Sequence, residues 1–334
     1  TLRRTGQQLA QEWDQLGAEV QVVAEPDFFG FLLSAMSRNA DQALRLLREC
    51  VEEPALREED LQRARIQQIG TIRVARDSIL ARAQELLDRA LYPGTSYALP
   101  PHGREQVVAK LTSEQLREWH SRVVKRQLPL AIIVGDTAGS ALVSSQLAEA
   151  FRRRELDTAI SVRVPGVPRP SEQIETRRSE QTAVAIGLAG PKASERAGRD
   201  ALKVIEAAMN GVGGRFDRAI VQKKLAVMVN LGSDAAFAVG NIHAQILTAP
   251  GNEQGARSAF LGEIEGLTRN GLGSDEMSAG RALAAATRLV SLQSQHTRAM
   301  EYARAVFAQQ QASDVDVAAE RLLKVTEDDI KRVG

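Results

Sequence analysis

The stretch that decides the fold class is LGAEVQVVAEPDFFGFLLSAM, residues 16–36. Apolar residues recur at helical spacing over 8–16 and stop at Gly17, a residue type that commonly follows a helix C-terminus. Two apolar runs follow, 18–24 and 28–36, separated by a Pro-Asp turn, and this pattern predicts a pair of antiparallel strands. A helix that leads into a strand pair indicates an α+β fold.

Outward from this stretch, the pattern predicts amphipathic helices with a few strands among them. In the first half, helices are expected from Asn39 or Asp41 to 51, at 58–91, from Thr112 or Ser113 to 126 and at 140–154, with a strand at 130–134. In the second half, we expect strands at 181–188, 225–231 and 237–247, a glycine-rich turn at 211–214, and helices at 194–209, 253–269, 274–310 and from Thr326. The shared order of the two halves indicates a duplicated fold.

Three prolines lie within 162–170, the composition of an exposed linker. We therefore predict a first domain at 1–161, a linker at 162–170 and a second domain at 171–334. The length of 334 residues agrees with two domains, because single cores rarely grow much past about 250 residues. Each domain is expected to be an α/β sandwich, in which helices cover an antiparallel-rich sheet.

Charge and hydropathy exclude two classes of partner. The chain carries 43 basic and 42 acidic residues, a net charge of +1, and so lacks the basic surface that binds a nucleic acid backbone. Its longest apolar runs, such as 130–134, are far shorter than the roughly 20 residues of a transmembrane helix. We expect a soluble protein with no nucleic acid partner. The sequence does not distinguish a cytoplasmic from a periplasmic location.

Several short motifs follow one another along the chain. The first half contains, in order, 16–22, Glu53-Pro54 with 61–65, 97–103, 111–116 and 134–136, and the second half contains 213–216, 223–226 and 270–272 before a long helix. In this order and spacing, the chain resembles the pitrilysin/insulinase-like (inverzincin) zinc metallopeptidases, in particular their mitochondrial-processing-peptidase-like bacterial branch. The resemblance covers nearly the whole chain, and we expect two similar domains in a clam-shell arrangement.

Members of this family bind zinc through two histidines of an H-x-x-E-H motif and a glutamate on a later helix, and the motif glutamate acts as general base. A water-activating zinc needs three protein ligands and one open position. By the resemblance, Thr71 occupies the position at which the family has this glutamate, and no acidic residue occurs within 61–76. The motif helix, with the N-terminal strand, would precede Thr1.

The histidines of the chain do not replace this site. His102, His120, His243 and His296 have no metal-ligand spacing to one another, and a structural or solvated role is expected for each. We therefore expect no metal and no other cofactor in this chain, although zinc is the cofactor of the family that it resembles.

The resemblance also implies residues that contact a peptide. The edge strand that accepts an extended substrate corresponds to the strand with Gln21 and Val22, and the turn with a substrate-holding arginine corresponds to Gly213, Gly214 and Arg215. Val227 occupies the position of the tyrosine that accompanies this arginine. The alternative is that Arg215 forms a structural bridge with a nearby acid, such as Asp217 or Glu206.

Three function classes agree with these residues. The favoured hypothesis is a non-catalytic (pseudopeptidase) subunit that binds peptides or unfolded proteins. It would complete a peptide-binding chamber with a zinc-bearing homologous subunit, or act as a homodimer. The second class is a structural protein like the core subunits of respiratory complexes. The third is an active zinc metalloendopeptidase whose motif lies before Thr1. The chain alone is predicted to be inactive.

Overall fold

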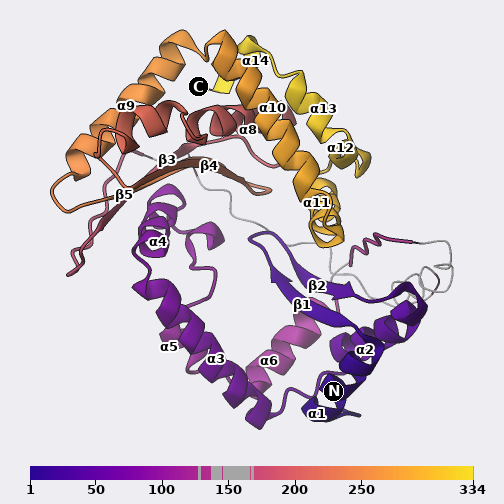
Figure 1. The fold of residues 1–334 in the computed structure, drawn as a ribbon. Coiled ribbons are helices and arrows are strands. Elements are labelled where there is room, and N and C mark those ends of the chain that lie inside the picture. The colour runs from indigo at the N-terminus through magenta and orange to yellow at the C-terminus, as the bar shows by residue number, and fades with distance from the viewer. Residues whose placement is uncertain (127–128, 137–144, 146–165, 167–168, 334) are drawn as a thin grey trace. The chain divides into compact units, whose positions relative to one another are not determined.

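The computed structural model describes residues 1–126, 129–136, 145, 166 and 169–333 (Figure 1). The described chain is α+β, as the sequence predicts, and it is mostly helical with small antiparallel sheets. It divides into two compact units. Unit 1 comprises Thr1–Arg73, Pro101–Ser161 and Arg298–Met300, and unit 2 comprises Val74–Pro100, Val162–Thr297 and Glu301–Gly334. The predicted helix at 140–154, apart from Ser145, and most of the predicted linker at 162–170 lie outside the described residues.

Unit 1 begins with the helix and strand pair that the sequence predicts. Helix α1 (Gly6–Leu16) starts with a capping box formed by Thr5 and Gln8. It ends at Gly17, whose φ of 56° is a left-handed conformation that favours glycine. Strands β1 (Glu19–Ala24) and β2 (Phe29–Ser34) then pair antiparallel, and we call this pair the β1–β2 ribbon. Both predictions are confirmed.

The remaining described elements of unit 1 are helical. They are η1 (Ser37–Asn39), α2 (Ala40–Glu52), most of α3 (Glu58–Asp77), α5 (Glu105–Val108), α6 (Ser113–Trp119) and the π-helical turn η3 (His120–Val124). In the described part of this unit, the buried apolar side chains are those of Ala43, Leu46 and Leu61. Unit 1 therefore has little hydrophobic core among these residues.

Two sequence predictions for the first half are wrong. The helix predicted at 58–91 is two helices, α3 and α4 (Ile79–Leu91), because Ser78 has an extended backbone and its Oγ accepts a hydrogen bond from Ala81 N. This bond satisfies one of the free N–H groups at the start of α4, which makes the interruption favourable. At 130–134 the structure shows no strand, because these residues have no ladder partner in the described part of the chain. An apolar run becomes a strand only through such pairing.

Unit 2 is built on an antiparallel sheet with the strand order β3-β5-β4 in its described part. The strands are β3 (Thr182–Ala189), β4 (Met228–Ala235) and β5 (Gly240–Thr248). The helices besides α4 are η2 (Ser96–Ala98), α8 (Arg196–Asn210), η4 (Asp217–Val221), α9 (Glu253–Asn270), α10 (Ser274–Ser291), α11 (Gln295–Phe307), α12 (Ser313–Asp316), α13 (Ala318–Leu323) and α14 (Glu327–Val333). Figure 1 shows α8 and α10 on one side of this sheet and α4 on the other. The core contains Ile205, Met209, Phe216, Ile220 and Ile246, all nearly inaccessible to solvent.

The helix predicted at 274–310 is also two helices. Helix α10 ends at Ser291, and α11 begins after Ser294, whose Oγ accepts a hydrogen bond from Thr297 N. The cause is again a serine that caps a new helix. Helices α12 and α13 lie in a stretch for which the sequence predicted no element. The other predicted elements of the second half are confirmed, with ends that differ by a few residues.

Residues 74–100 pack within unit 2, although they precede the predicted linker. Leu87 and Leu91 of α4 lie against Gly187 of β3, where a Cβ atom would sit 2.7 Å from Leu87 Cδ1. The Tyr92 hydroxyl accepts a hydrogen bond of 2.9 Å from Asn241 Nδ2 of β5. Burial raises the pKa of this tyrosine. Helix α4 is thus part of the core that the sheet of unit 2 requires.

Candidate functional site

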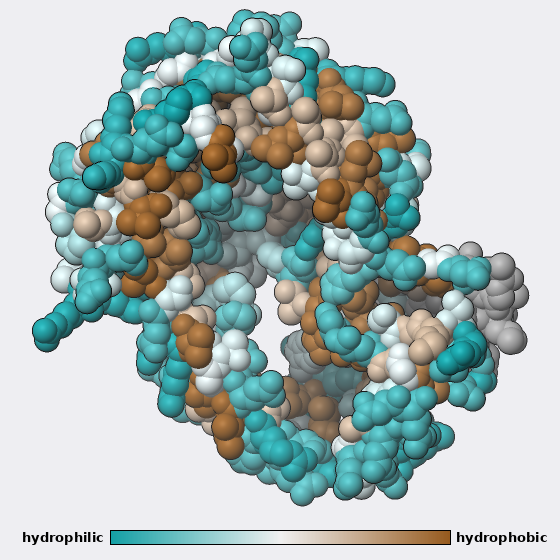
Figure 2. Space-filling model, viewed as in Figure 1, coloured by the Kyte–Doolittle hydropathy of each residue, from teal (hydrophilic) through white to brown (hydrophobic). Residues whose placement is uncertain are grey.

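The β1–β2 ribbon presents one apolar face. Side chains alternate between the two faces of a strand, and residues paired across a ladder share a face. The register pairs Val20 with Leu33, Val22 with Phe31 and Ala24 with Phe29, so these six apolar residues lie together. We call them the apolar face of the ribbon. Val22 is 75% exposed, Phe31 43% and Phe29 41%, and Figure 2 shows hydrophobic surface along this part of the molecule.

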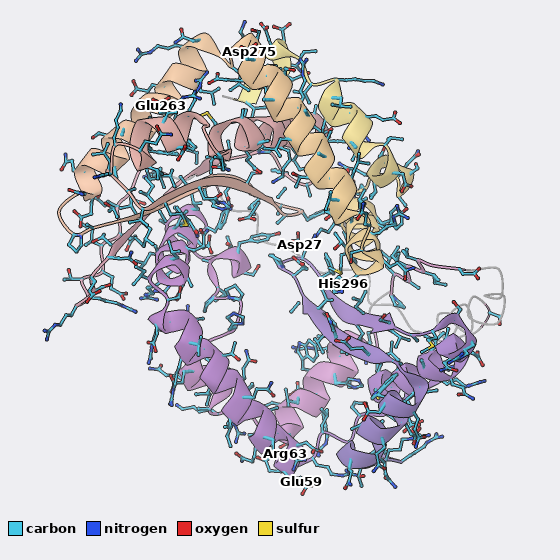
Figure 3. The ribbon with its side chains drawn as sticks, viewed as in Figure 1. Asp27, Glu59, Arg63, Glu263, Asp275 and His296 are labelled. Carbon is cyan, nitrogen blue, oxygen red and sulfur yellow. The ribbon has the colours of Figure 1, made fainter. Side chains whose placement is uncertain are left out.

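The opposite face of β1 is polar at its start. Gln21 Nε2 donates a hydrogen bond of 2.8 Å to Glu19 Oε1, and both side chains are exposed. The predicted contact residues Gln21 and Val22 therefore lie on opposite faces of one strand. In the described part of the chain, β1 pairs only with β2, which leaves its outer backbone edge without a ladder. An edge of this kind can accept another strand. Figure 3 marks Asp27 in the turn at the end of the ribbon.

The turn at 211–216 connects α8 to η4 and contains the other predicted contact residues. Gly213 has a φ of 73°, and a Cβ at Gly214 would lie 2.7 Å from the carbonyl oxygens of Met209 and Gly211. Both positions therefore favour glycine. Phe216 is 1% exposed and stacks on Phe260, with ring centroids 5.1 Å apart, so the end of the turn is anchored in the core.

Arg215 forms a two-pronged ion pair with Glu276 at the start of α10. Arg215 Nε donates to Glu276 Oε1 (2.9 Å), and Nη2 donates to Glu276 Oε2 (2.5 Å) and to the Gly271 carbonyl (2.8 Å). These bonds to Arg215, together with the Gly273 N–H, lower the pKa of Glu276 to about 2. Parallel bonds between a guanidinium and a carboxylate are stronger than neutral ones. Arg215 thus ties the turn to α10.

The acid that pairs with Arg215 is not one that the sequence indicated. Asp217 instead accepts hydrogen bonds from Gly213 N (3.0 Å) and from Gln222 Nε2 (2.9 Å). Glu206 instead pairs with Lys203 and accepts from the Ser233 hydroxyl. Glu276 lies 61 residues after Arg215, and no local spacing links the two residues.

Thr71 and Val227 are the residues at which the sequence analysis expects a zinc-ligand position and a tyrosine position. Thr71 is exposed on α3, and its hydroxyl donates to the Gln67 carbonyl one turn earlier (3.2 Å). Val227 is 65% exposed, and its N–H donates to the Leu247 carbonyl (2.8 Å). The residues around Thr71 do not fit a zinc ion, because the Thr71 hydroxyl is engaged with the backbone and no carboxylate occurs within 61–76.

Two of the four histidines contact neighbouring polar groups of the chain. His120 Nε2 lies 2.6 Å from the Val51 carbonyl, and His243 Nδ1 lies 2.9 Å from Asn241 Oδ1. His296 stands in the first turn of α11, where Figure 3 labels it, and His102 precedes Gly103 in a loop. Across the part of the chain that the structure describes, no group of three histidine, cysteine or acidic side chains is arranged to hold a metal ion.

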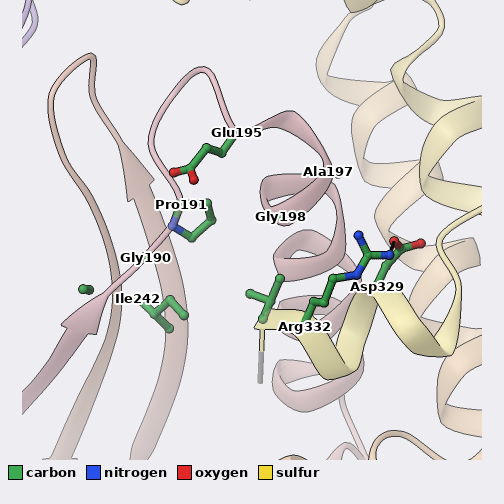
Figure 4. Close-up of a pocket in the computed structure, with 10 residues that line it drawn as sticks. Gly190, Pro191, Glu195, Ala197, Gly198, Ile242, Asp329 and Arg332 are labelled. Atoms are coloured by element: carbon green, nitrogen blue, oxygen red, sulfur yellow. Dashed lines mark hydrogen bonds and ion pairs between the residues drawn. The ribbon is translucent and has the colours of Figure 1, made fainter.

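Sequence reasoning missed a cavity of about 380 Å³ in unit 2. Figure 4 shows its lining, which comes from the end of β3, the start of α8, β5 and α14. Its volume is within the range of small-molecule sites. Its charged groups are already engaged, since Arg332 Nη2 donates to Asp329 Oδ1 (2.8 Å) and Glu195 Oε2 accepts from Lys192 N (2.7 Å). We assign no ligand to this cavity.

Comparisons with known proteins cover both halves of the chain. Residues 1–102 match the family model described as insulinase (peptidase family M16), and residues 110–283 match the one described as peptidase M16 inactive domain. A crystal structure of a peptidase M16 inactive domain from Pseudomonas fluorescens is similar in fold, with a TM-score of 0.84 and 18% identity over 98% of this chain and 80% of that chain. The crystal structure of a protease from Helicobacter pylori is also similar in fold, with a TM-score of 0.81 and 15% identity over 97% of this chain and 80% of that chain. No curated protein matches the sequence.

None of the helices in the described ranges has the length and apolar character to cross a membrane.

Proposed function

Because the chain belongs to the peptidase M16 (insulinase) family, we propose that it is a non-catalytic subunit that forms part of a peptide-binding chamber with a zinc-bearing homologous partner. One observation carries this proposal. Helix α3 has no acidic residue between Asp60 and Asp77, and Thr71 stands where the resemblance requires a zinc-binding glutamate. About four helical turns without a carboxylate mean that a shift of several residues in the alignment would not bring an acidic side chain to this position.

The finer features of the proposal come from the resemblance to the mitochondrial-processing-peptidase-like bacterial branch. We propose that the domains predicted at 1–161 and 171–334 are similar in fold and contribute to the chamber, with residues 74–100 packed on the second domain. The partner is a zinc-bearing homologue, or a second copy of this chain in a homodimer. The ligand is a peptide or an unfolded segment of protein. No cofactor is proposed for this chain.

Two surfaces are proposed to contact the peptide. The first is the outer edge of β1 with Gln21 and Val22, which offers backbone groups for strand addition. The second is the turn with Gly213, Gly214 and Arg215. Glu276 and the Gly271 carbonyl occupy Nε and Nη2 of Arg215, while Nη1 has no hydrogen-bond partner among the described residues. This nitrogen supports a contact to a peptide carbonyl in addition to the structural role of the ion pair.

The proposal is tested with the purified chain alone and together with a zinc-bearing homologue from the same cell. We expect less than about 0.1 zinc per chain and no cleavage of an unfolded peptide by the chain alone. We expect chelator-sensitive cleavage by the pair. The variant Thr71→Glu should not give activity to the isolated chain, because one carboxylate is not a three-ligand site. One tightly bound zinc per isolated chain, or chelator-sensitive turnover by it, would falsify the proposal and favour an active zinc endopeptidase.

A structural role is the runner-up, and the Arg215–Glu276 ion pair favours it. This pair satisfies most of the guanidinium without a substrate, as expected of a scaffold residue. The two functions differ in what copurifies with the chain. Recovery with a zinc-bearing homologue and protection of a bound peptide support the chamber. Recovery only in an assembly without such a homologue, and without peptide binding, supports the scaffold.

A further inference from the structure

We propose that the β1 edge selects extended peptides in which long apolar side chains alternate with polar or basic ones. This inference rests on the proposed function, in which a peptide adds to β1 as a further strand. It goes beyond that function because it assigns a sequence pattern to the peptide. The register and the exposed fractions of the β1–β2 ribbon carry it.

An added strand would extend the apolar face of the ribbon. A residue paired with Val22 or with a neighbour two positions away places its side chain on the same face as Val22. On this face, every residue of the ribbon is apolar, and Val22 is 75% exposed. An added strand therefore continues the apolar face with every second residue. An apolar side chain at these positions covers surface that water otherwise contacts.

Side chains on the apolar face differ in length between the two strands. On the apolar face, β1 contributes the short side chains of Val22 and Ala24, whereas β2 contributes the longer Phe31 and Phe29 opposite them. Phe29 is itself supported by Trp119, with ring centroids 5.3 Å apart. The side chains of this face therefore extend less far from the sheet over β1 than over β2. A long or aromatic side chain from the added strand can extend over Val22 toward Phe31, since diagonal neighbours in a sheet are within reach of such side chains.

The intervening residues of an added strand lie on the other face of the sheet. There β1 presents first Glu19 and Gln21, joined by a hydrogen bond of 2.8 Å and both exposed, and then the half-buried Val23. The polar preference therefore applies at the start of β1. An apolar side chain gains little at this position, while a lysine or arginine gains a partner in the Glu19 carboxylate. Opposite charges directly across a strand pair are favourable. The edge thus favours a basic or polar residue between two apolar ones.

The test uses two labelled nine-residue peptides of identical composition, one alternating Phe or Leu with Lys or Thr and one with the same residues in blocks. Binding to the chain in complex with its zinc-bearing partner is measured by fluorescence anisotropy, with chelator present to prevent cleavage. We expect the alternating peptide to bind about tenfold more tightly, the effect of two or three cross-strand pairs. A third peptide carries the alternating sequence with backbone N-methyl groups on one edge. Its binding should be lost, because its N–H groups can no longer pair.

Two exposed variants locate the effect. The variant Val22→Lys should abolish the preference for the alternating peptide, because it places a charge on the apolar face. The matched control is Ile66→Lys on α3, at a position that is 74% exposed and outside the ribbon, and it should retain the preference. If alternating and block peptides bind with equal affinity, the inferred sequence pattern is overturned. If N-methylation still abolishes binding in that case, the peptide nevertheless binds by strand addition. Absence of binding by every peptide would contradict the proposed function itself.

Discussion

The Arg215–Glu276 ion pair gives the sharpest test of the structure. We expect Arg215→Met to lower the free energy of unfolding by about 1–2 kcal/mol at pH 7. The fall in the Glu276 pKa from 4.5 to about 2 sets a ceiling of about 3.5 kcal/mol, at about 1.4 kcal/mol per pKa unit. The side chains of Arg215 and Glu276 are 15% and 26% exposed, so water screens part of this energy. The corresponding decrease in Tm is about 3–6 °C.

The pH dependence has a definite sign. The pKa of Glu276 is depressed in the folded state, so its contribution to stability is fully present above about pH 4.5 and is lost as pH falls toward 2. The cost of Arg215→Met should therefore be largest near neutral pH and smaller at pH 3. Above pH 5 it should not depend on pH.

The assay is a double-mutant cycle in urea with Arg215→Met, Glu276→Gln and the pair of substitutions. Arg269→Met is the control, because Arg269 and Glu265 form an ion pair whose side chains are 74% and 64% exposed, and its removal should change stability by less than about 0.5 kcal/mol. A coupling energy below about 0.5 kcal/mol, or one that grows as pH falls, would refute the reasoning. An unchanged Tm with a raised peptide KM in the complex would show that Arg215 acts mainly on the peptide.

Three further substitutions test other parts of the fold. Gly240→Ala would place a Cβ 2.0 Å from the Pro191 carbonyl oxygen, so we expect a loss of more than about 2 kcal/mol in urea unfolding, and a change below about 0.5 kcal/mol would contradict this close approach. Ser78→Ala should cost about 1 kcal/mol through the lost cap of α4, and Ser78→Asn should restore it; equal stabilities for the three proteins would show that the cap contributes nothing. Tyr92→Phe removes the hydroxyl that accepts from Asn241 Nδ2, so we expect the free energy of unfolding to fall by about 1–2 kcal/mol and amide exchange in α4 to become faster. Unchanged amide exchange would show that this hydrogen bond does not hold α4 on the sheet.

Local signals in the sequence predicted most of the elements. Gly17 ends α1, and the Pro-Asp turn separates β1 from β2, because these residues act on the backbone next to them. At 58–91 and 274–310, the sequence predicted one long helix where the structure has two, because a local signal was misjudged. Ser78 and Ser294 each interrupt a long amphipathic pattern, and only the observed side-chain hydrogen bond distinguishes a cap from an ordinary helical serine.

Long-range pairings could not be predicted in the same way. The partner of Arg215 is Glu276, and several acidic residues closer in sequence were equally plausible by charge alone. The packing of α4 on the sheet of unit 2 depends on Gly187, which makes room for Leu87 and Leu91 about 100 residues away. Such contacts follow from the topology of the folded chain, which a single sequence does not encode in any short spacing. The contact residues proposed for the peptide remain predictions for this reason.

The packing of α4 against the sheet of unit 2 has a consequence for synthesis on the ribosome. Helix α4 ends at Leu91, but the sheet that covers it is complete only when β5 ends at Thr248. At about 5–20 residues per second, translation of the roughly 150 residues between them takes on the order of 10–30 s. For that time the nascent chain carries the apolar side of α4 without its native cover. A chaperone that holds nascent chains would therefore find the apolar side of α4 exposed before residues 162–334 of unit 2 are made.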